Sequence, residues 1–489
     1  MAYKHGVYVS EMPTSVLPPT SVSAGLPFVV GTAPVNMADE ANVNKPVLCA
    51  SYEEAVAAFG YVPPTAAGAL RKHEFTLSEF IRSHFGLFGV GPCVLVNVLD
   101  PAEHKTTATT TAVTLTANGE ATVAETGILP SSVVLSNGDT TYKAGEDYEL
   151  SFDTDGHLVI IAARTESGFA IPANTELTLV ADKLNPSAVT ADDIVGGVDT
   201  AGNKSGLELI DECFPRFRLA PGLLLAPGYS SSPTVAAVLA AKAANINQHF
   251  EAVALIDVPT DTVKQHAAVA EWKTTNNIVD PLQVACWPML ALDGVAYNLS
   301  TQMAGAIGVT DAANDDVPYV SPSNHALQMT AAVLADGTEV WLSPDTAAAL
   351  NGQGVVTALN FIGGWKCWGN RTACYPGNTD AKDSFIPVRR MFGWVKNTLV
   401  QTFWQKLDGP INKRLIDTIV DSANMWLNGL AARQYILGGR VEFLSSENSQ
   451  VDLLDGKLTF HVYLTPPTPA REINFVLEFD ANYMETLFS

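Results

Sequence analysis

The sequence NFIGGWKCWGNRT, residues 360–372, opens the part of the chain around which the rest is organised. Gly363, Gly364 and Gly369 in this stretch can adopt backbone conformations that are closed to other residues. The residues that follow predict two amphipathic helices and then two alternating strands. The stretch therefore marks the beginning of a C-terminal unit with its own α+β pattern.

The first of these helices is predicted at about residues 388–407, because apolar side chains recur there at spacings of three and four. The apolar positions are Val388, Phe392, Val395, Leu399 and Phe403. Gly409 and Pro410 form a start signal for the second helix, which we expect to end at Gly438 and Gly439.

The two helices reverse the sign of the chain's charge. Residues 384–440 contain eight Lys or Arg and three Asp, so the segment is +5 in a chain of net charge −23. Trp394, Phe403 and Trp404 are interleaved with the basic residues, and large aromatics beside arginine are typical of buried protein contacts. The alternative is that these basic side chains form a solvated surface without a partner. We expect the first helix to bind an acidic protein partner.

Two half-buried strands are predicted at the end of the chain. The first covers residues 457–464, and the second has Ile473, Phe475, Leu477 and Phe479 at alternating positions. The connector TPPTPAR is too stiff for a tight hairpin and spans about 20 Å in a polyproline conformation. We therefore expect the second strand to pair with the sheet of a neighbouring subunit.

The first residues of the chain predict a similar arm. Val7 and Val9 alternate in a short strand that is followed by prolines and has no adjacent strand to pair with. Such an isolated strand pairs at a distance or with another chain, and a disordered tail is the alternative.

The composition favours a subunit of a large assembly. The chain has 489 residues, which predicts two to four domains. Only 16% of the residues are charged, below the roughly 25% of an average soluble domain, and 47% are hydrophobic. Burial between subunits explains both values. The net charge of −23 argues against general nucleic-acid binding, which needs a concentrated basic face.

Other features argue against a membrane, a metal or a cofactor. Residues 219–241 carry no charge but are interrupted by prolines, so we expect no direct membrane insertion. The first residues lack the apolar core of a signal peptide. The six cysteines lack CxxC spacing and are interpreted as reduced, buried thiols.

The middle of the chain predicts an α/β scaffold with a β-rich interruption. Strands at residues 26–33, 93–99 and 252–259 alternate with helices at 50–60, 76–86 and 233–249. Between residues 105 and 187 the composition changes to Thr, Val and Gly with turn signals such as Asn118-Gly119, which predicts a small all-β insertion.

Both ends of the chain resemble one known family. GGWKCWGNRT is similar to a glycine, Trp-Gly and Arg-Thr signature of the contractile tail sheath proteins of bacteriophages and related contractile injection systems. HGVYVSE at residues 5–11 and VVGTAP at residues 29–34 resemble the opening of the same family. The resemblance covers roughly half of the chain, and the joint occurrence is more specific than any one motif.

The resemblance implies a division of the chain and a structural function. It implies an α/β multidomain fold with an inactive, subtilisin-like α/β domain at residues 22–102 and 188–350. An outer all-β insertion domain at 103–187 and an α+β sheath domain at 351–465 complete the body, with arms at 1–21 and 466–489. The expected function is a sheath subunit that polymerises around an inner tail tube and contracts to drive the tube through a cell envelope.

The resemblance also implies the partners. They are further copies of the chain in stacked, hexameric rings, the tube protein, and baseplate and tail terminator proteins. The location would be the tail of a virion or contractile particle assembled in the bacterial cytoplasm. Because the family places its C-terminal domain innermost, Arg389, Arg390, Lys396 and Lys406 are expected to contact the tube.

Chemical functions find weaker support in the sequence. In STQMA, residues 300–304, Gln302 stands where a subtilisin-type protease has its nucleophilic serine, and an amide cannot attack a carbonyl. Ser300, His249 and Asp257 have the residue types of a catalytic triad, but a chain of 489 residues contains many such trios by chance. We expect no enzyme, and a secreted or surface adhesin remains the alternative function.

Metal sites find equally weak support. The acidic stretch DAANDDV, residues 311–317, lacks the pattern of a calcium loop and is interpreted as a solvated loop. Cys367, Cys374 and His461 lack zinc-site spacing.

Overall fold

A large, mostly parallel sheet forms the centre of the molecule. The computed structural model describes residues 22–166 and 168–488. The strand order is β2 (Val47–Cys49), β5 (Cys93–Asn97), β1 (Pro27–Gly31), β15 (Leu223–Leu225), β16 (Val253–Asp257), β17 (Gln283–Cys286), β21 (Val355–Asn360) and β22 (Trp365–Trp368). Only the edge strands β2 and β22 run antiparallel to their neighbours.

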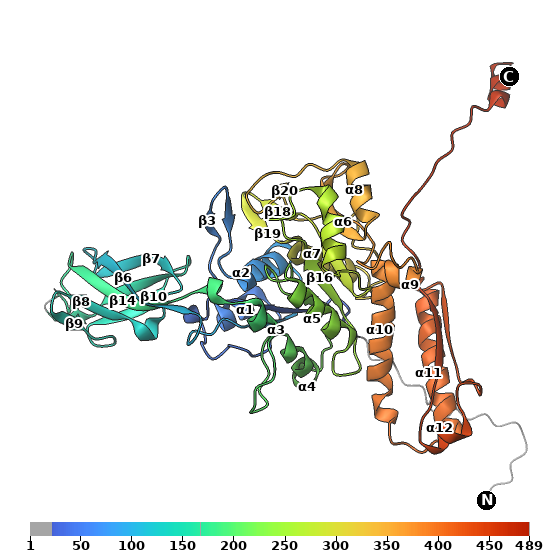
Figure 1. Ribbon diagram of the computed structural model, residues 1–489, viewed down its shortest axis with the longest axis horizontal. Coiled ribbons are helices and arrows are strands. Elements are labelled where there is room, and N and C mark those ends of the chain that lie inside the picture. The colour runs from blue at the N-terminus through green and yellow to red at the C-terminus, as the bar shows by residue number, and fades with distance from the viewer. Residues whose placement is uncertain (1–21, 167, 489) are drawn as a thin grey trace, which may run out of the picture.

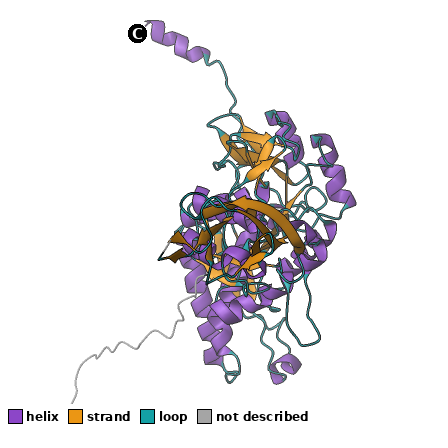
Figure 2. Cartoon of the chain, turned by 90° about the vertical axis from the view of Figure 1, so that its left-hand side faces the viewer, coloured by secondary structure: helices purple, strands orange, loops and turns teal. Residues whose placement is uncertain are grey.

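Helices cover both faces of this sheet (Figures 1 and 2). One face packs against α1 (Tyr52–Phe59), α2 (Thr76–Ile81) and α7 (Leu299–Ala312), and the other against α5 (Pro233–Ala244), α6 (His266–Thr275) and α8 (Pro344–Asn351). Phe28 and Val30 of β1 point to the second face and Val29 to the first. This burial on both faces explains the continuous apolar strands of the sequence.

Smaller elements complete the α/β region. Short helices α3 (Ala191–Val195) and α4 (Cys213–Phe217) precede β15. A second sheet has the order β20 (Ala331–Val333), β18 (Met289–Leu292), β19 (Val295–Tyr297), β4 (Leu70–Lys72) and β3 (Thr65–Ala67). The strands and helices predicted in this region are confirmed, with ends that differ by a few residues.

The described residues between 105 and 184 form strands and one short helical turn, and they project to one side of the α/β region (Figure 1). One sheet has the order β6 (Lys105–Thr114), β14 (Glu176–Leu184), β8 (Val134–Asn137) and β9 (Thr140–Tyr142). A second has the order β10 (Tyr148–Phe152), β11 (His157–Ala162) and β7 (Glu120–Thr126), and β12 (Arg164–Thr165) pairs with β13 (Gly168–Phe169).

This β region has a hydrophobic core separate from the two cores of the α/β region. Its first and last strands pair along their length, with Lys105 opposite Leu184. The chain therefore enters and leaves the β region at one place, where Asn185 N–H donates to the His104 carbonyl over 2.8 Å.

The C-terminal residues form a helical and β-hairpin unit beside the α/β region (Figure 1). Its elements are α9 (Ala381–Ser384), α10 (Ile386–Phe403), α11 (Lys413–Ala432), β23 (Gly438–Glu442), α12 (Gln450–Leu454) and β24 (His461–Thr465). The predicted first helix is confirmed as α10, and the strand predicted at residues 457–464 is β24.

Two predicted ends of the second helix are wrong. Helix α11 begins after Asn412, whose side chain accepts a hydrogen bond from Leu415 N–H over 2.9 Å, and not at Gly409 and Pro410. Gly438 and Gly439 do not end a helix but open β23, because their backbone pairs with Thr465 and Leu464. An asparagine cap supplied a stronger start signal than the proline.

Candidate functional site

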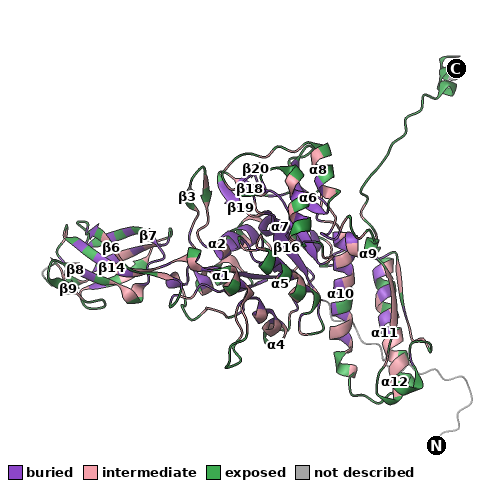
Figure 3. Ribbon diagram, in the orientation of Figure 1, coloured by how far each residue is buried: buried purple, intermediate pink, exposed green. Residues whose placement is uncertain are grey.

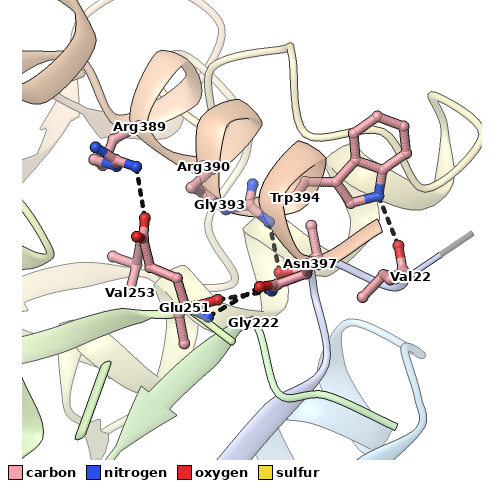
Figure 4. Close-up of a pocket in the computed structure, with 11 residues that line it drawn as sticks. Val22, Gly222, Glu251, Val253, Arg389, Arg390, Gly393, Trp394 and Asn397 are labelled. Carbon is pink, nitrogen blue, oxygen red and sulfur yellow. Dashed lines mark hydrogen bonds and ion pairs between the residues drawn. The ribbon is translucent and has the colours of Figure 1, made fainter. Parts of the chain in front are cut away.

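Helix α10 forms a junction with three distant parts of the chain (Figure 4). Arg389 Nη2 donates to Glu251 Oε1 over 2.6 Å, and its Nη1 to Asp383 Oδ1 over 3.3 Å. About two turns of helix further, Asn397 exchanges two hydrogen bonds with the backbone of Glu251, over 2.8 and 2.9 Å. Residue 251 lies just before β16, so these bonds fix α10 to the central sheet.

Arg390 is the most buried member of the junction. Its guanidinium makes a two-point contact with the carboxylate of Asp311, at the end of α7, and Nη1 to Oδ1 is 3.0 Å. The side chains of Arg390 and Asp311 are only 2% and 4% exposed. Removing either partner would leave a buried charge without its counter-ion, so the pair holds α10 and α7 together.

The same helix holds the first described residues of the chain. Trp394 Nε1 donates to the Val22 carbonyl over 2.7 Å, and Arg390 Nη2 to the Ala24 carbonyl over 3.1 Å. On the other side of this segment, a Cβ added to Gly222 would lie 2.0 Å from the Ala24 oxygen, so only glycine fits there. The point at which residues 1–21 join the body is thus packed on both sides.

The space enclosed by these residues is about 20 Å³, which is room for about one water molecule. The junction is therefore a packed structural contact and not a ligand site. It makes one mechanical unit of α10, the central sheet, α7 and the segment at residues 22–25.

Two of the predicted tube contacts, Arg389 and Arg390, are paired inside the chain. Arg389 is 13% exposed and Arg390 is 2% exposed, and both are paired within their own chain. In this conformation Glu251 and Asp311 of the α/β region neutralise them, and their contact with a tube stays a prediction. Lys396 is 45% exposed although it lies 3.4 Å from Glu251, and Lys406 is half-buried. Their contact with a tube stays a prediction.

The acidic stretch at residues 311–317 is also not a purely solvated loop. Asp311 belongs to α7 and is buried against Arg390. Asp315 Oδ2 accepts a 2.5 Å hydrogen bond from the Tyr435 hydroxyl, and Arg433 lies 3.9 Å away. The stretch therefore joins the α/β region to the C-terminal unit through residues whose partners lie far away in sequence.

The C-terminal arm, residues 466–488, leaves the body and is exposed over nearly its whole length (Figure 3). Ile473, Phe475, Leu477 and Phe479 are 70%, 88%, 95% and 82% exposed. No strand is formed by the described residues after Thr465, so the predicted second strand has no strand partner among the residues that the structure describes. Val7 and Val9 lie outside the described residues.

Ser300, His249 and Asp257 do not form a catalytic triad in the structure, as expected from the sequence. Asp257 accepts hydrogen bonds from Ser300 Oγ over 2.5 Å, from Ser300 N–H over 2.9 Å and from Ser230 Oγ over 3.2 Å. His249 is exposed and packs against Trp404, 5.0 Å between ring centroids. Burial raises the pKa of Asp257 to about 6. The Asp257 carboxylate accepts the Ser300 N–H in the first turn of α7, so its role is to cap that helix. Gln302 bonds the backbone of Gln328 in the core.

Tail sheath proteins of two phages resemble this chain, one over nearly its whole length and the other over about two thirds of it. The tail sheath protein of Burkholderia phage BcepMu is 29% identical over 500 residues, covering 99% of this chain and 98% of the relative. The tail sheath protein of Escherichia phage P2 is 25% identical over 338 residues, covering 67% of this chain and 78% of the relative. No family model matches the chain.

Solved sheath structures share the fold. The sheath complex of the extracellular contractile injection system PVC, in its contracted state, matches with a TM-score of 0.58 and 15% identity over 99% of both chains. A chain of the anti-feeding prophage (AFP) baseplate, 6-fold symmetrised, matches with a TM-score of 0.57 and 17% identity over 98% of this chain and 100% of that chain.

These comparisons support a contractile tail sheath protein. The function that they support is a structural, contractile sheath subunit located in the tail of a virion or particle, and they do not support the adhesin. The homologues also suggest a non-enzymatic role. The mixed α/β multidomain fold of the chain is the fold of the solved sheath structures.

The remaining candidate sites from the sequence are held within the described part of the chain. All six cysteines are free and buried. His461 contacts Glu447 over 2.7 Å and not a cysteine. Among the described residues, one group could hold a metal ion, namely Asp153, Asp155 and His157, but both oxygens of Asp153 are engaged within its own turn. None of the described helices is both long and apolar enough to span a membrane.

Sequence reasoning missed the acidic partners of α10, namely Glu251 and Asp311. It also missed a groove beside α10 and α11 that is lined by residues from several elements. The apolar periodicity of both helices was a signal for burial, but it could not show which surfaces stay uncovered.

Proposed function

We propose that this chain is the repeating subunit of a sheath that surrounds an inner tail tube and contracts to drive the tube through a target cell envelope. The observation that carries the proposal is the bare C-terminal arm, whose four alternating apolar side chains are 70–95% exposed. A row of this kind needs a covering partner, and the full-length likeness to tail sheath proteins supplies the class of partner.

The arm would add a strand to a neighbouring subunit. The β23–β24 hairpin is a two-stranded sheet. Asn424 of α11 bonds the backbone of Val441 on the β23 side, so the outer edge of β24 is the one offered to such a strand. Residues 1–21 would form a second link, and the α10 junction would anchor this link where Val22 and Ala24 bind Trp394 and Arg390. Neighbouring bodies would then move relative to one another as rigid units while the arms keep them joined.

Contraction in this scheme needs no chemical fuel. An extended sheath would be a metastable array that is kept from the contracted state by a kinetic barrier. The baseplate would lower the barrier, and tail terminator proteins would end the tube. Six subunits per ring are supported by the fold's occurrence in a 6-fold symmetrised baseplate. Assembly would take place in the bacterial cytoplasm.

We propose a division of labour between regions of the chain. Residues 22–102 and 188–350 would form a subtilisin-like α/β domain without protease activity, because Asp257 is used as a helix cap and Gln302 as a core residue. Residues 103–187 would form an outer domain, and residues 351–465 the domain nearest the tube. The arms would be residues 1–21 and 466–489.

The tube contact is proposed at the exposed cations of the C-terminal unit. Lys396 and Lys406 remain from the sequence prediction. Lys413 and Arg414, in the first turn of α11, are exposed, and no ion pair within the described chain involves either of them. Several surface ion pairs of roughly 0.2–1 kcal/mol each would hold the extended state and still break on contraction.

Electron microscopy tests the proposal. Purified full-length chain should form tubes, and a chain shortened before residue 466 should remain a folded monomer, as judged by circular dichroism and sedimentation. Tubes from the shortened chain would show that the arm is not the link. A full-length chain that stays monomeric at all concentrations would contradict the sheath function.

A further inference from the structure

An apolar groove lies between α10, α11 and the β23–β24 hairpin. Its volume is about 400 Å³. Apolar side chains dominate the lining, among them Phe403, Leu415, Ile419, Leu458, Phe460 and Val462. Lys406 and Asp408 are the charged residues that line it. We name this feature the α10–α11 groove. A groove of this size has room for several side chains of a short protein segment.

The end of the C-terminal arm has the properties of such a segment. Residues Ala481–Phe488 form a short helical turn, here named the end turn. Tyr483, Met484 and Leu487 of this turn are 74%, 54% and 72% exposed. Within the turn, Thr486 Oγ1 donates to the Tyr483 carbonyl, and Figure 1 shows the turn far from the body of the molecule.

The direction of the arm favours the groove of a second copy over the chain's own groove. Strand β24 ends at Thr465, which pairs with Gly438, whereas Leu458, Phe460 and Val462 of the groove lie toward its other end. The arm therefore leaves the hairpin away from its own groove (Figure 1). Three prolines, at positions 466, 467 and 469, follow immediately and oppose a sharp reversal of the chain.

Charge also favours this pairing. Residues 471–489 contain one basic and four acidic residues, a net charge of −3. The segment that supplies α10 and α11, residues 384–440, has a net charge of +5, or +3 without Arg389 and Arg390, which are already paired with carboxylates of their own chain. Opposite charges of this kind steer two copies toward a contact and disfavour like-charged alternatives.

We propose that the α10–α11 groove binds the end turn of a second copy of this chain. This inference rests on the proposed sheath function and adds a side-chain lock to the strand pairing of the arm. It also fixes the direction of pairing. An incoming arm that runs antiparallel to β24 brings its end turn to the groove, whereas a parallel arm brings it to the opposite end of the hairpin, near Leu437.

Cysteine cross-linking between two differently tagged full-length chains tests the inference. One chain carries Leu487→Cys and the other Leu415→Cys, and the mixed tubes are oxidised. The natural cysteines are buried, so they compete little. We expect a disulfide-linked heterodimer on a non-reducing gel, because the two positions should approach within the roughly 7 Å between Cα atoms that a disulfide needs. The heterodimer should be lost when Leu437→Cys, exposed at the far end of β23, replaces Leu415→Cys.

The outcomes separate the groove from the sheath function. Tubes in which Leu487→Cys bonds Leu437→Cys would overturn the groove assignment and leave the sheath function intact. So would tubes of a chain that carries both Leu487→Cys and Leu415→Cys, if the disulfide formed only within single chains. If the cysteine variants form no tubes, the groove assignment is tested instead by comparing the assembly of two other variants, Leu487→Asp and Leu487→Met. The inference expects the Asp variant to lose assembled protein in a sedimentation assay and the Met variant to keep it, and equal fractions would overturn it. Absence of tubes from the unmodified chain would contradict both.

Discussion

Arg390 shows how a single side chain connects distant parts of this protein. Its guanidinium contacts Asp311 of α7 and the carbonyl of Ala24, and the Arg390 and Asp311 side chains are almost completely buried. The sequence indicated only a basic residue beside an apolar stripe, which is also the pattern of a surface residue. Its partner Asp311 lies 79 positions away, so no local pattern could predict the burial.

We predict that Arg390→Gln lowers the free energy of unfolding by about 3–5 kcal/mol, because it leaves the Asp311 carboxylate buried without a counter-ion. The matched control is Lys396→Gln, which removes a half-exposed cation from the same helix and should change stability by less than about 1 kcal/mol. Urea unfolding of both variants measures the difference. Equal losses would mean that the buried pair has no special structural role.

Glu79 makes stability depend on pH. Burial raises the pKa of Glu79 to about 7, although Asn298 N–H donates to Oε1 over 2.7 Å. Between about pH 4.5 and 7 the folded state therefore holds a proton that the unfolded state releases. By linkage, this group's contribution to the free energy of unfolding falls as pH rises through that range.

We predict that Glu79→Gln gains stability relative to the unmodified chain as pH rises from 5 to 8, by roughly 2–3 kcal/mol at about 1.4 kcal/mol per pKa unit. Burial lowers the pKa of His73 to about 4 and of His84 to about 3, so these two groups make stability rise with pH. Both histidines are present in the variant and in the unmodified chain, so their effect cancels in the comparison. Urea unfolding at the two pH values is the measurement. A constant difference, like that expected for the exposed control Glu53→Gln, would contradict the buried carboxylate.

At the scale of elements, α10 was predictable because a period of three and four residues records the face that packs inward. The start of α11 was not, because two signals competed and the Asn412 side chain prevailed over Pro410. The β region was indicated by its turn residues and threonines. Its separate core depends on strand order, which no local pattern records.

We predict that residues 105–184 can be replaced by a short Gly/Ser linker without loss of folding or assembly. The β region has its own core, and its first and last residues pair directly, so a linker need only bridge a short gap. Sedimentation and electron microscopy measure assembly. If the excised chain cannot fold, the β region is part of the main core.

The exposed cations of α11 carry the predicted tube contact. Reversing Lys413 and Arg414 to Glu should weaken the attachment of extended sheath to its tube, and raising the salt concentration should do the same by screening. The matched control is Arg389→Glu. Arg389 is paired with Glu251 inside the chain, so this change should lower the free energy of unfolding and leave the attachment to the tube largely unchanged. Co-sedimentation of sheath with tube protein is the measurement. Unchanged attachment of the α11 variant at low salt would place the tube contact elsewhere.

At the scale of the whole molecule, the sequence and the structure agree that this chain is incomplete alone. Low charge, an alternating apolar segment after a proline-rich connector and the open β24 edge of a two-stranded hairpin all favour burial against further copies of the chain. The sequence could predict the arm because apolar alternation is local. It could not predict where the arm binds, because the acceptor surface combines residues from α10, α11 and β24.

The most direct test is a cryo-EM reconstruction of tubes formed by the full-length chain. The account predicts that Ile473, Phe475, Leu477 and Phe479 form a strand in the β23–β24 sheet of a neighbouring subunit, which makes that sheet at least three-stranded. An arm that folds back onto its own body, or one that stays free while the bodies pack into tubes, would contradict it.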